Sequence, residues 1–163
     1  MPFYLKERDV SADIAGTRSA LIVPCRFCPA ASLAVREGTP YVRLFRGLLR
    51  TDSYESYIRR LRSRLEGEGI RTQVFASRFL AHFVMCMWPA RRRRALAREA
   101  ARHDALVVLG CEAAVETARQ AAKATGCRVV AAMEIEGIMN VTPALSLPFD
   151  VRLRVNSVTR VTT

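Results

Sequence analysis

The amino-acid sequence predicts an α/β protein, with a single three-layer domain built on a mostly parallel sheet and helices on both faces. Three short apolar runs have the length and β-branching of buried strands, at residues 19–23, 105–110 and 128–133. Segments with helical spacing lie between such runs, and the connecting turns are short. Strand–helix–strand units of this kind are typical of a parallel sheet covered by helices.

The first strand and its exit turn are the most informative part of the chain. The run at 19–23 ends at Pro24, and Cys25-Arg26-Phe27-Cys28 follows at once. Pro29 suits the first position of a helix, so we expect a helix of small residues from there to about Glu37. Residues 1–18 predict an irregular N-terminal segment, which leaves 19–163 as one α/β domain.

The middle of the chain predicts a helix and a second strand. Residues 41–50 are ambiguous. Thr51 to Ser53 offer N-caps for a helix whose apolar side chains recur every three or four residues, at Tyr54, Tyr57, Ile58, Leu61 and Leu65. Gly67 and Gly69 end this helix, and residues 73–76 predict a strand.

The second half repeats the strand–helix pattern. An apolar stretch at 79–88 precedes Pro89, which begins a strongly basic helix through about Arg102. The strand at 105–110 leads into a helix that opens at Cys111, and the strand at 128–133 follows it. The tail from 144 to 161 alternates apolar and polar residues, which predicts an edge strand. This order is that of a flavodoxin-like or Rossmann-like domain.

Composition limits the class of protein. The chain has 163 residues, a net charge of +11 and 50% hydrophobic residues, as expected of a globular domain. No apolar run approaches the roughly 20 residues of a membrane-spanning helix, and the first eight residues do not form a secretory signal. We therefore expect a cytoplasmic protein that makes no membrane contact. Thiols stay reduced in that compartment, so cysteines there serve as ligands, nucleophiles or core residues.

Three of the five cysteines follow predicted strands. Cys25 and Cys28 come after the first strand, and Cys111 comes after the strand at 105–110. Functional groups of a parallel sheet collect at the carboxyl ends of its strands, so we expect these thiols to lie together at one edge. Cys86 can reach the same edge from its apolar segment, although filling of the core explains it as well. Cys127 precedes a strand and belongs to the opposite edge.

This placement predicts a cysteine-based site. A thiol at a helix N-terminus is stabilised as thiolate, the form that attacks electrophiles and binds soft metals. Cys25 and Cys111 are therefore candidate catalytic residues. Cys25, Cys28, Cys111 and Cys86 are candidate metal ligands, for zinc or an iron–sulfur cluster. The function predicted is redox chemistry, or sulfur or coenzyme metabolism, on a small anionic substrate or coenzyme. Whether the protein is an enzyme stays open.

Several polar residues lie near the expected edge. Glu112 follows Cys111, and Glu134 follows the strand at 128–133, which makes both candidate catalytic acids or bases. Arg26, Asn140 and Thr142 are candidate contacts to a cofactor or substrate. His82, four residues before Cys86, shares a helical face with it if that segment is helical.

Strand, CxxC and helix in succession resemble the thioredoxin-like redox proteins. Val141-Thr142-Pro143-Ala144 is similar to the cis-proline segment that faces their active site. The resemblance covers about ten residues in two places and implies a thiol–disulfide oxidoreductase that uses Cys25 and Cys28. The strong strand at 105–110 lies where that fold has helices, so this reading is an alternative.

A basic binding module is the other alternative. Lys6 and Lys123 are the only lysines among the 26 basic residues, and Arg91 to Arg94 form the densest run of charge. Such a surface attracts anions, so the protein could dock an acidic partner or nucleic acid without catalysis. Four consecutive helical residues spread around the axis, and aromatic residues are not interleaved among them, which disfavours nucleic acid. A homo-oligomer is compatible with all of these readings.

Overall fold

The computed structural model describes residues 2–43, 51–76, 83–146 and 149–161, and these residues form two four-stranded sheets. One sheet is parallel, with strand order β4-β2-β5-β6. The other is antiparallel, with order β1-β7-β8-β3. The prediction of one mostly parallel sheet in a single three-layer domain is therefore wrong: half of the strands belong to a second sheet of different type.

The parallel sheet contains the strands that the apolar runs predict. Its members are β2 (Ser19–Pro24), β4 (Arg71–Val74), β5 (Ala105–Leu109) and β6 (Arg128–Ala131). Every residue of β2 and β5 is buried, whereas β4 and β6 have exposed positions. Continuous burial indicates strands covered on both faces, which is why the two central strands read as unbroken apolar runs.

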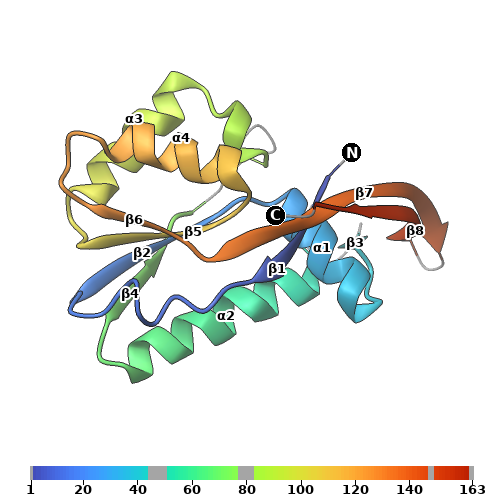
Figure 1. The fold of residues 1–163 in the computed structure, drawn as a ribbon, viewed down its shortest axis with the longest axis horizontal. Helices are drawn as coiled ribbons and strands as arrows, with labels where there is room; N and C mark the ends of the chain where they lie inside the picture. The colour runs from blue at the N-terminus through green and yellow to red at the C-terminus, as the bar shows by residue number, and fades with distance from the viewer. Residues whose placement is uncertain (1, 44–50, 77–82, 147–148, 162–163) are drawn as a thin grey trace.

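Helices lie on both sides of this sheet (Figure 1). α3 (Ala90–Ala100) and α4 (Glu112–Ala122) pack together on one side, and α2 (Asp52–Gly67) lies on the other. α1 (Cys28–Glu37) packs against α2 and β1. α2 buries a stripe of side chains at three- and four-residue spacing, which matches the amphipathic pattern of its sequence: Tyr54, Tyr57, Ile58, Leu61 and Leu65.

The antiparallel sheet arises because the chain leaves the parallel sheet after β6. A single residue, Ala132, separates β6 from β7 (Met133–Ser146), which pairs with β1 (Phe3–Glu7) on one side. β8 (Asp150–Arg160) pairs with β7 on its other side, and β3 (Val42–Arg43) pairs with the start of β8. The β7–β8 hairpin extends away from the parallel sheet in Figure 1.

Two segments thus form strands where the sequence predicts none. Residues 3–7 form β1 inside the segment expected to be irregular, and residues 134–143 continue β7 beyond the end of the strand predicted at 128–133. The acids at 134 and 136 lie in the paired part of β7, opposite β1, instead of ending a strand. The tail does contain a strand, β8, but β8 lies between β7 and β3 in the antiparallel sheet, so the predicted edge position is wrong.

Ser32 of α1 links the antiparallel sheet to the helix near the first cysteines. Its buried hydroxyl accepts a hydrogen bond from the Leu5 N–H of β1 at 2.9 Å and donates one to the Cys28 carbonyl at 2.8 Å. The antiparallel sheet is therefore tied to the start of α1.

No helix among the described residues is both long enough and apolar enough to cross a membrane.

Candidate functional site

The order of the parallel strands creates a point where two connections diverge. From β2 the chain runs through α1 and α2 to β4, on one side of β2. From β5 it runs through α4 to β6, away from β2. β2 and β5 are neighbours, with Pro24 opposite Leu109 at their carboxyl ends. Ligands of open parallel sheets bind at such a switch point, so side chains that follow β2 and β5 are well placed for function.

Cys25 lies at this point and is almost fully enclosed. Its N–H donates to the Leu109 carbonyl at 2.9 Å, which extends the β2–β5 ladder by one residue. Its side chain is 2% exposed. Burial raises the pKa of the Cys25 thiol, and the nearby N–H groups of Met85 and Phe27 oppose that shift only in part. Cys25 is therefore a neutral thiol at physiological pH.

Cys111 and Cys28 face one another across the switch point. Cys111 is the N-cap residue of α4, and Cys28 is the first residue of α1. The interaction between the two thiols is the largest influence on both pKa values, lowering that of Cys111 to about 6 and raising that of Cys28. The N–H groups of Ala113 and Ala114 also favour the Cys111 thiolate. This is a thiolate held by a helix N-terminus and by a neighbouring thiol.

Gly110 allows the two chain segments to approach this closely. A Cβ atom at position 110 would lie 2.5 Å from the Ala114 Cβ and 3.3 Å from the Cys25 Cβ. The first of these separations is impossible without movement of α4, because it is a contact with a short, rigid side chain. A glycine between β5 and Cys111 therefore lets α4 start directly against the Cys25 turn.

Arg26 lies in the turn between Cys25 and Cys28, but an acidic side chain balances its charge. The Arg26 guanidinium forms an ion pair with Glu55 of α2, and both side chains are mostly buried. The Arg26 N–H donates to the Phe83 carbonyl at 3.0 Å, and the rings of Phe27 and Phe83 pack edge to face. The turn between the two cysteines is thus fixed by α2 and by the segment before the 3-10 helix Met85–Met87.

Other candidate residues lie apart from the thiols or at their margin. Glu112 is exposed at the start of α4 beside Cys111. Glu134 pairs with Lys6 at 2.7 Å within the antiparallel sheet. Asn140 and Thr142 lie on β7, and both accept hydrogen bonds from the Asn156 amide, at 3.3 and 2.9 Å.

The two remaining cysteines, Cys86 and Cys127, lie outside the Cys28–Cys111 pair. Cys86 is exposed in the 3-10 helix, and its charge would raise the pKa of Cys25. Cys127 precedes β6, where burial raises its pKa to about 11. His82 lies outside the described residues. Within the described parts of the chain, no group of three or more metal-ligating side chains is arranged to hold a metal ion.

Two tyrosines, Tyr41 and Tyr54, interact with the site, but no sequence pattern identified them as functional candidates. The Tyr41 hydroxyl is buried without a hydrogen-bond partner among the described residues, and burial together with Cys28 and Cys25 raises its pKa. Tyr54, fully enclosed on α2, donates weakly to the Leu109 carbonyl at 3.4 Å. Tyr54 is part of the apolar stripe of α2, and Tyr41 falls in an ambiguous segment, so neither could be distinguished from a core residue.

No family model, no curated protein and no solved structure matches this chain.

Proposed function

We propose that this protein performs thiol–disulfide redox chemistry with Cys111 as the nucleophile and Cys28 as the resolving thiol. The observation that carries the proposal is the contact between these two thiols at the switch point of the parallel sheet. The pairing differs from that of the thioredoxin-like alternative, in which Cys25 and Cys28 react. Here the enclosed, neutral Cys25 is the poorer nucleophile, because a buried thiol resists ionisation.

The reaction is a two-step exchange. The Cys111 thiolate attacks one sulfur of a disulfide substrate and expels the other as a thiolate, which takes up a proton. Cys28 then gives up its proton and attacks the Cys111 sulfur, which releases the second substrate thiol. The substrate disulfide is reduced to two thiols, and the protein dithiol is oxidised to a Cys28–Cys111 disulfide. We assign this chemistry to the cytosol, where a reducing pool can regenerate the dithiol.

An equilibrium titration in glutathione buffers tests this proposal. The wild-type protein should undergo one two-electron oxidation, measured as the loss of two free thiols per chain. Cys111→Ser and Cys28→Ser should abolish that transition. Cys86→Ser is the matched control and should preserve it, since Cys86 is exposed and lies outside the thiol pair. Retention of the transition in Cys28→Ser would contradict the assignment of Cys28.

A soft-metal site is a second candidate, favoured by the electrostatic coupling of Cys25 to both other thiols. Three thiolates suit zinc or an iron–sulfur cluster. Cys25→Ser separates the two candidates, because the redox pair does not use Cys25 whereas a three-thiol site requires it. If this second candidate holds, metal analysis and visible spectra of anaerobically purified protein should show bound metal in the wild type and its loss in Cys25→Ser. In the glutathione titration, oxidation of the wild type should then release metal instead of forming a disulfide.

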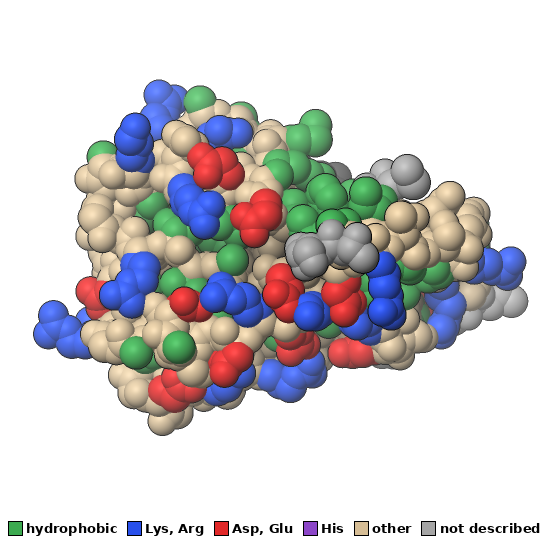
Figure 2. All heavy atoms as spheres, viewed as in Figure 1, with side chains coloured by type: hydrophobic (Ala, Val, Ile, Leu, Met, Phe, Trp, Pro, Cys, Tyr) green, Lys and Arg blue, Asp and Glu red, His purple; other side chains and the backbone are tan. Residues whose placement is uncertain are grey.

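The structure supports a basic docking module less well. Of the four-arginine run, Arg92 stacks on Phe75 at 4.0 Å and Arg93 donates to the Trp88 carbonyl at 3.0 Å. Two of these guanidiniums are therefore engaged by the protein itself. Basic and acidic side chains also alternate over the face shown in Figure 2, instead of forming a continuous basic surface.

A further inference from the structure

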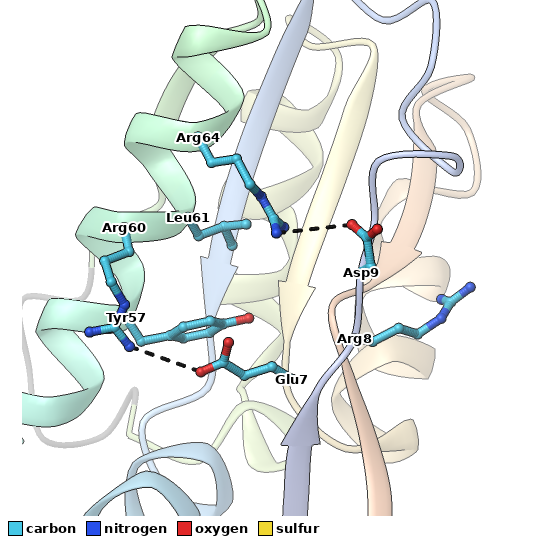
Figure 3. A pocket seen from close by; sticks show the side chains of 7 residues that line it. All are labelled: Glu7, Arg8, Asp9, Tyr57, Arg60, Leu61 and Arg64. Carbon is cyan, nitrogen blue, oxygen red and sulfur yellow. Dashed lines mark ion pairs between the residues drawn. The ribbon is translucent and has the colours of Figure 1, made fainter. Parts of the chain in front are cut away.

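A second candidate site lies along α2, outside the thiol pair. A cavity of about 250 Å³ opens between α2 and the segment that follows β1. Figure 3 shows that Tyr57, Arg60 and Arg64 extend into it from the helix. Glu7 and Asp9 lie on the opposite wall, and Leu61 contributes apolar surface. None of these residues belongs to the proposed redox pair, so the inference stands independently of it.

The Tyr57 hydroxyl is the least expected feature of this cavity. The Tyr57 side chain is 5% exposed, and its hydroxyl is directed into the cavity. Burial and Glu7 raise the pKa of Tyr57, while Arg64 and Arg60 act against that shift. The phenol thus keeps its proton and offers a hydrogen-bond donor. A protonated phenol that points into a cavity can donate a hydrogen bond to a ligand there.

The two arginines of α2 add further donors. Arg60 and Arg64 are four residues apart and lie on the same helix face, where like charges repel. Both form only long ion pairs with the surrounding carboxylates: Glu7 and Glu37 lie 4.0 and 3.8 Å from Arg60, and Asp9 lies 3.9 Å from Arg64. These separations exceed the hydrogen-bond range of about 2.7–3.2 Å. An acceptor placed between the guanidiniums would relieve both the repulsion and the unfilled donors.

Arg8 is engaged elsewhere and takes no part. Its guanidinium pairs with Asp13 at 2.7 Å, donates to the Ala131 carbonyl at 3.0 Å, and is directed away from the cavity in Figure 3. This contrast shows that an arginine in this region can form close contacts where acceptors are available. Arg60 and Arg64 lack such contacts on the cavity side.

We propose that the cavity binds a phosphate group, either as free phosphate or as the end of a small phosphate ester. The phosphate oxygens accept hydrogen bonds from both guanidiniums and from the Tyr57 hydroxyl. Phosphate suits this lining because its oxygens accept from several directions and match the planar fork of arginine. Glu7 opposes binding through its charge and holds Arg60 loosely when the cavity is empty.

Calorimetric titration with inorganic phosphate tests the proposal, at constant ionic strength maintained with chloride. A parallel titration with methyl phosphate distinguishes a site for the free ion from one for an ester, and tighter binding of either supports the proposal. Saturable binding is expected for the wild type. Arg64→Gln should weaken it by about tenfold or more, because a charge-assisted contact is lost. Arg94→Gln, at an exposed arginine of α3, is the matched control and should leave affinity unchanged.

Two further variants separate binding from structural effects. Tyr57→Phe should weaken phosphate binding severalfold without lowering the melting temperature, because the hydroxyl makes no contact that the folded protein needs. Glu7→Gln should strengthen binding, which is the opposite sign from Arg64→Gln. Glycine, titrated in the same way, serves as a ligand without a phosphate group. The proposal is overturned if phosphate does not bind saturably, if glycine binds as well as phosphate, or if Glu7→Gln and Arg94→Gln both weaken phosphate binding.

Discussion

Replacing Cys28 with alanine is expected to slow alkylation of Cys111 at pH 7 by up to about thirtyfold. The Cys28 thiol is the largest cause of the lowered pKa of Cys111, which is about 6. At pH 7 a thiol with that pKa is mostly ionised. Only about 3% of it would be ionised if its pKa returned to the ordinary value of about 8.5. Since the thiolate is the reactive form, the rate follows the ionised fraction.

The measurement follows each cysteine separately. Short pulses of iodoacetamide between pH 5 and 9, followed by mass spectrometry of peptides, give a rate for Cys111 alone. The wild-type rate should rise with a midpoint near pH 6, and the Cys28→Ala midpoint should move upward. Cys86→Ala serves as the control and should not shift the Cys111 midpoint. An unchanged midpoint in Cys28→Ala would show that the helix N-terminus alone stabilises the thiolate.

The free energy of unfolding is expected to fall steeply above about pH 9–10 under reducing conditions. Burial raises the pKa values of Cys25 and Tyr54 in the folded protein, and Tyr41 and Tyr57 shift in the same direction. The unfolded chain releases these protons near the ordinary values of about 8.5 for cysteine and 10 for tyrosine. The stability from keeping these groups neutral is therefore complete below the unfolded pKa values and is lost as pH rises above them.

Cys111 has the opposite sign and acts in a different pH range. Its folded pKa is lowered, so its contribution is present above the unfolded value and is lost as pH falls toward about 6. It therefore does not offset the alkaline decline.

Tyr54→Phe isolates one contribution to the alkaline decline. One fully shifted group changes the free energy of unfolding by up to about 1.4 kcal/mol per pH unit. Urea unfolding between pH 7 and 11 should show that much less slope above pH 10 in the variant. At pH 7, where the phenol is protonated in both states, the two proteins should differ only by the weak contact to Leu109. A wild-type stability that stays flat to pH 11 would contradict the burial of these groups.

Local patterns predicted the parallel half of the fold well. β2 and β5 are buried on both faces, so every position is apolar and the strands are visible as runs. α2 is visible because one of its faces is buried and the other is solvated. The strand ends then placed Cys25, Cys28 and Cys111 at neighbouring positions, because the carboxyl ends of parallel strands share one edge.

The antiparallel half could not be predicted in the same way. β7 contains Gly137 and Pro143, both weak strand formers, and exposes many polar side chains. Its stability depends on pairing with β8, the other strand of its hairpin, and with β1, which is distant in sequence. Gly137 fits there because a Cβ atom would lie 2.4 Å from the Thr159 carbonyl oxygen. Such cross-strand requirements leave no periodic signal in the chain.

The details of the candidate site depend on the same long-range contacts. The sequence indicates which thiols share an edge, but the partner of Cys28 depends on how α1 and α4 begin. Cys28 meets Cys111 because α1 starts at Cys28 itself, while Cys25 stays in the extended turn that continues β2. The ion pair of Arg26 with Glu55 likewise requires the position of α2, which no local pattern specifies.

Disulfide mapping after mild oxidation tests directly whether Cys28 and Cys111 form the reactive pair. The protein is oxidised with oxidised glutathione, remaining thiols are blocked, and linked peptides are identified by mass spectrometry. We expect a Cys28–Cys111 link as the dominant product, formed equally well in Cys86→Ser. A dominant Cys25–Cys28 link, or no link involving Cys111, would contradict this pairing.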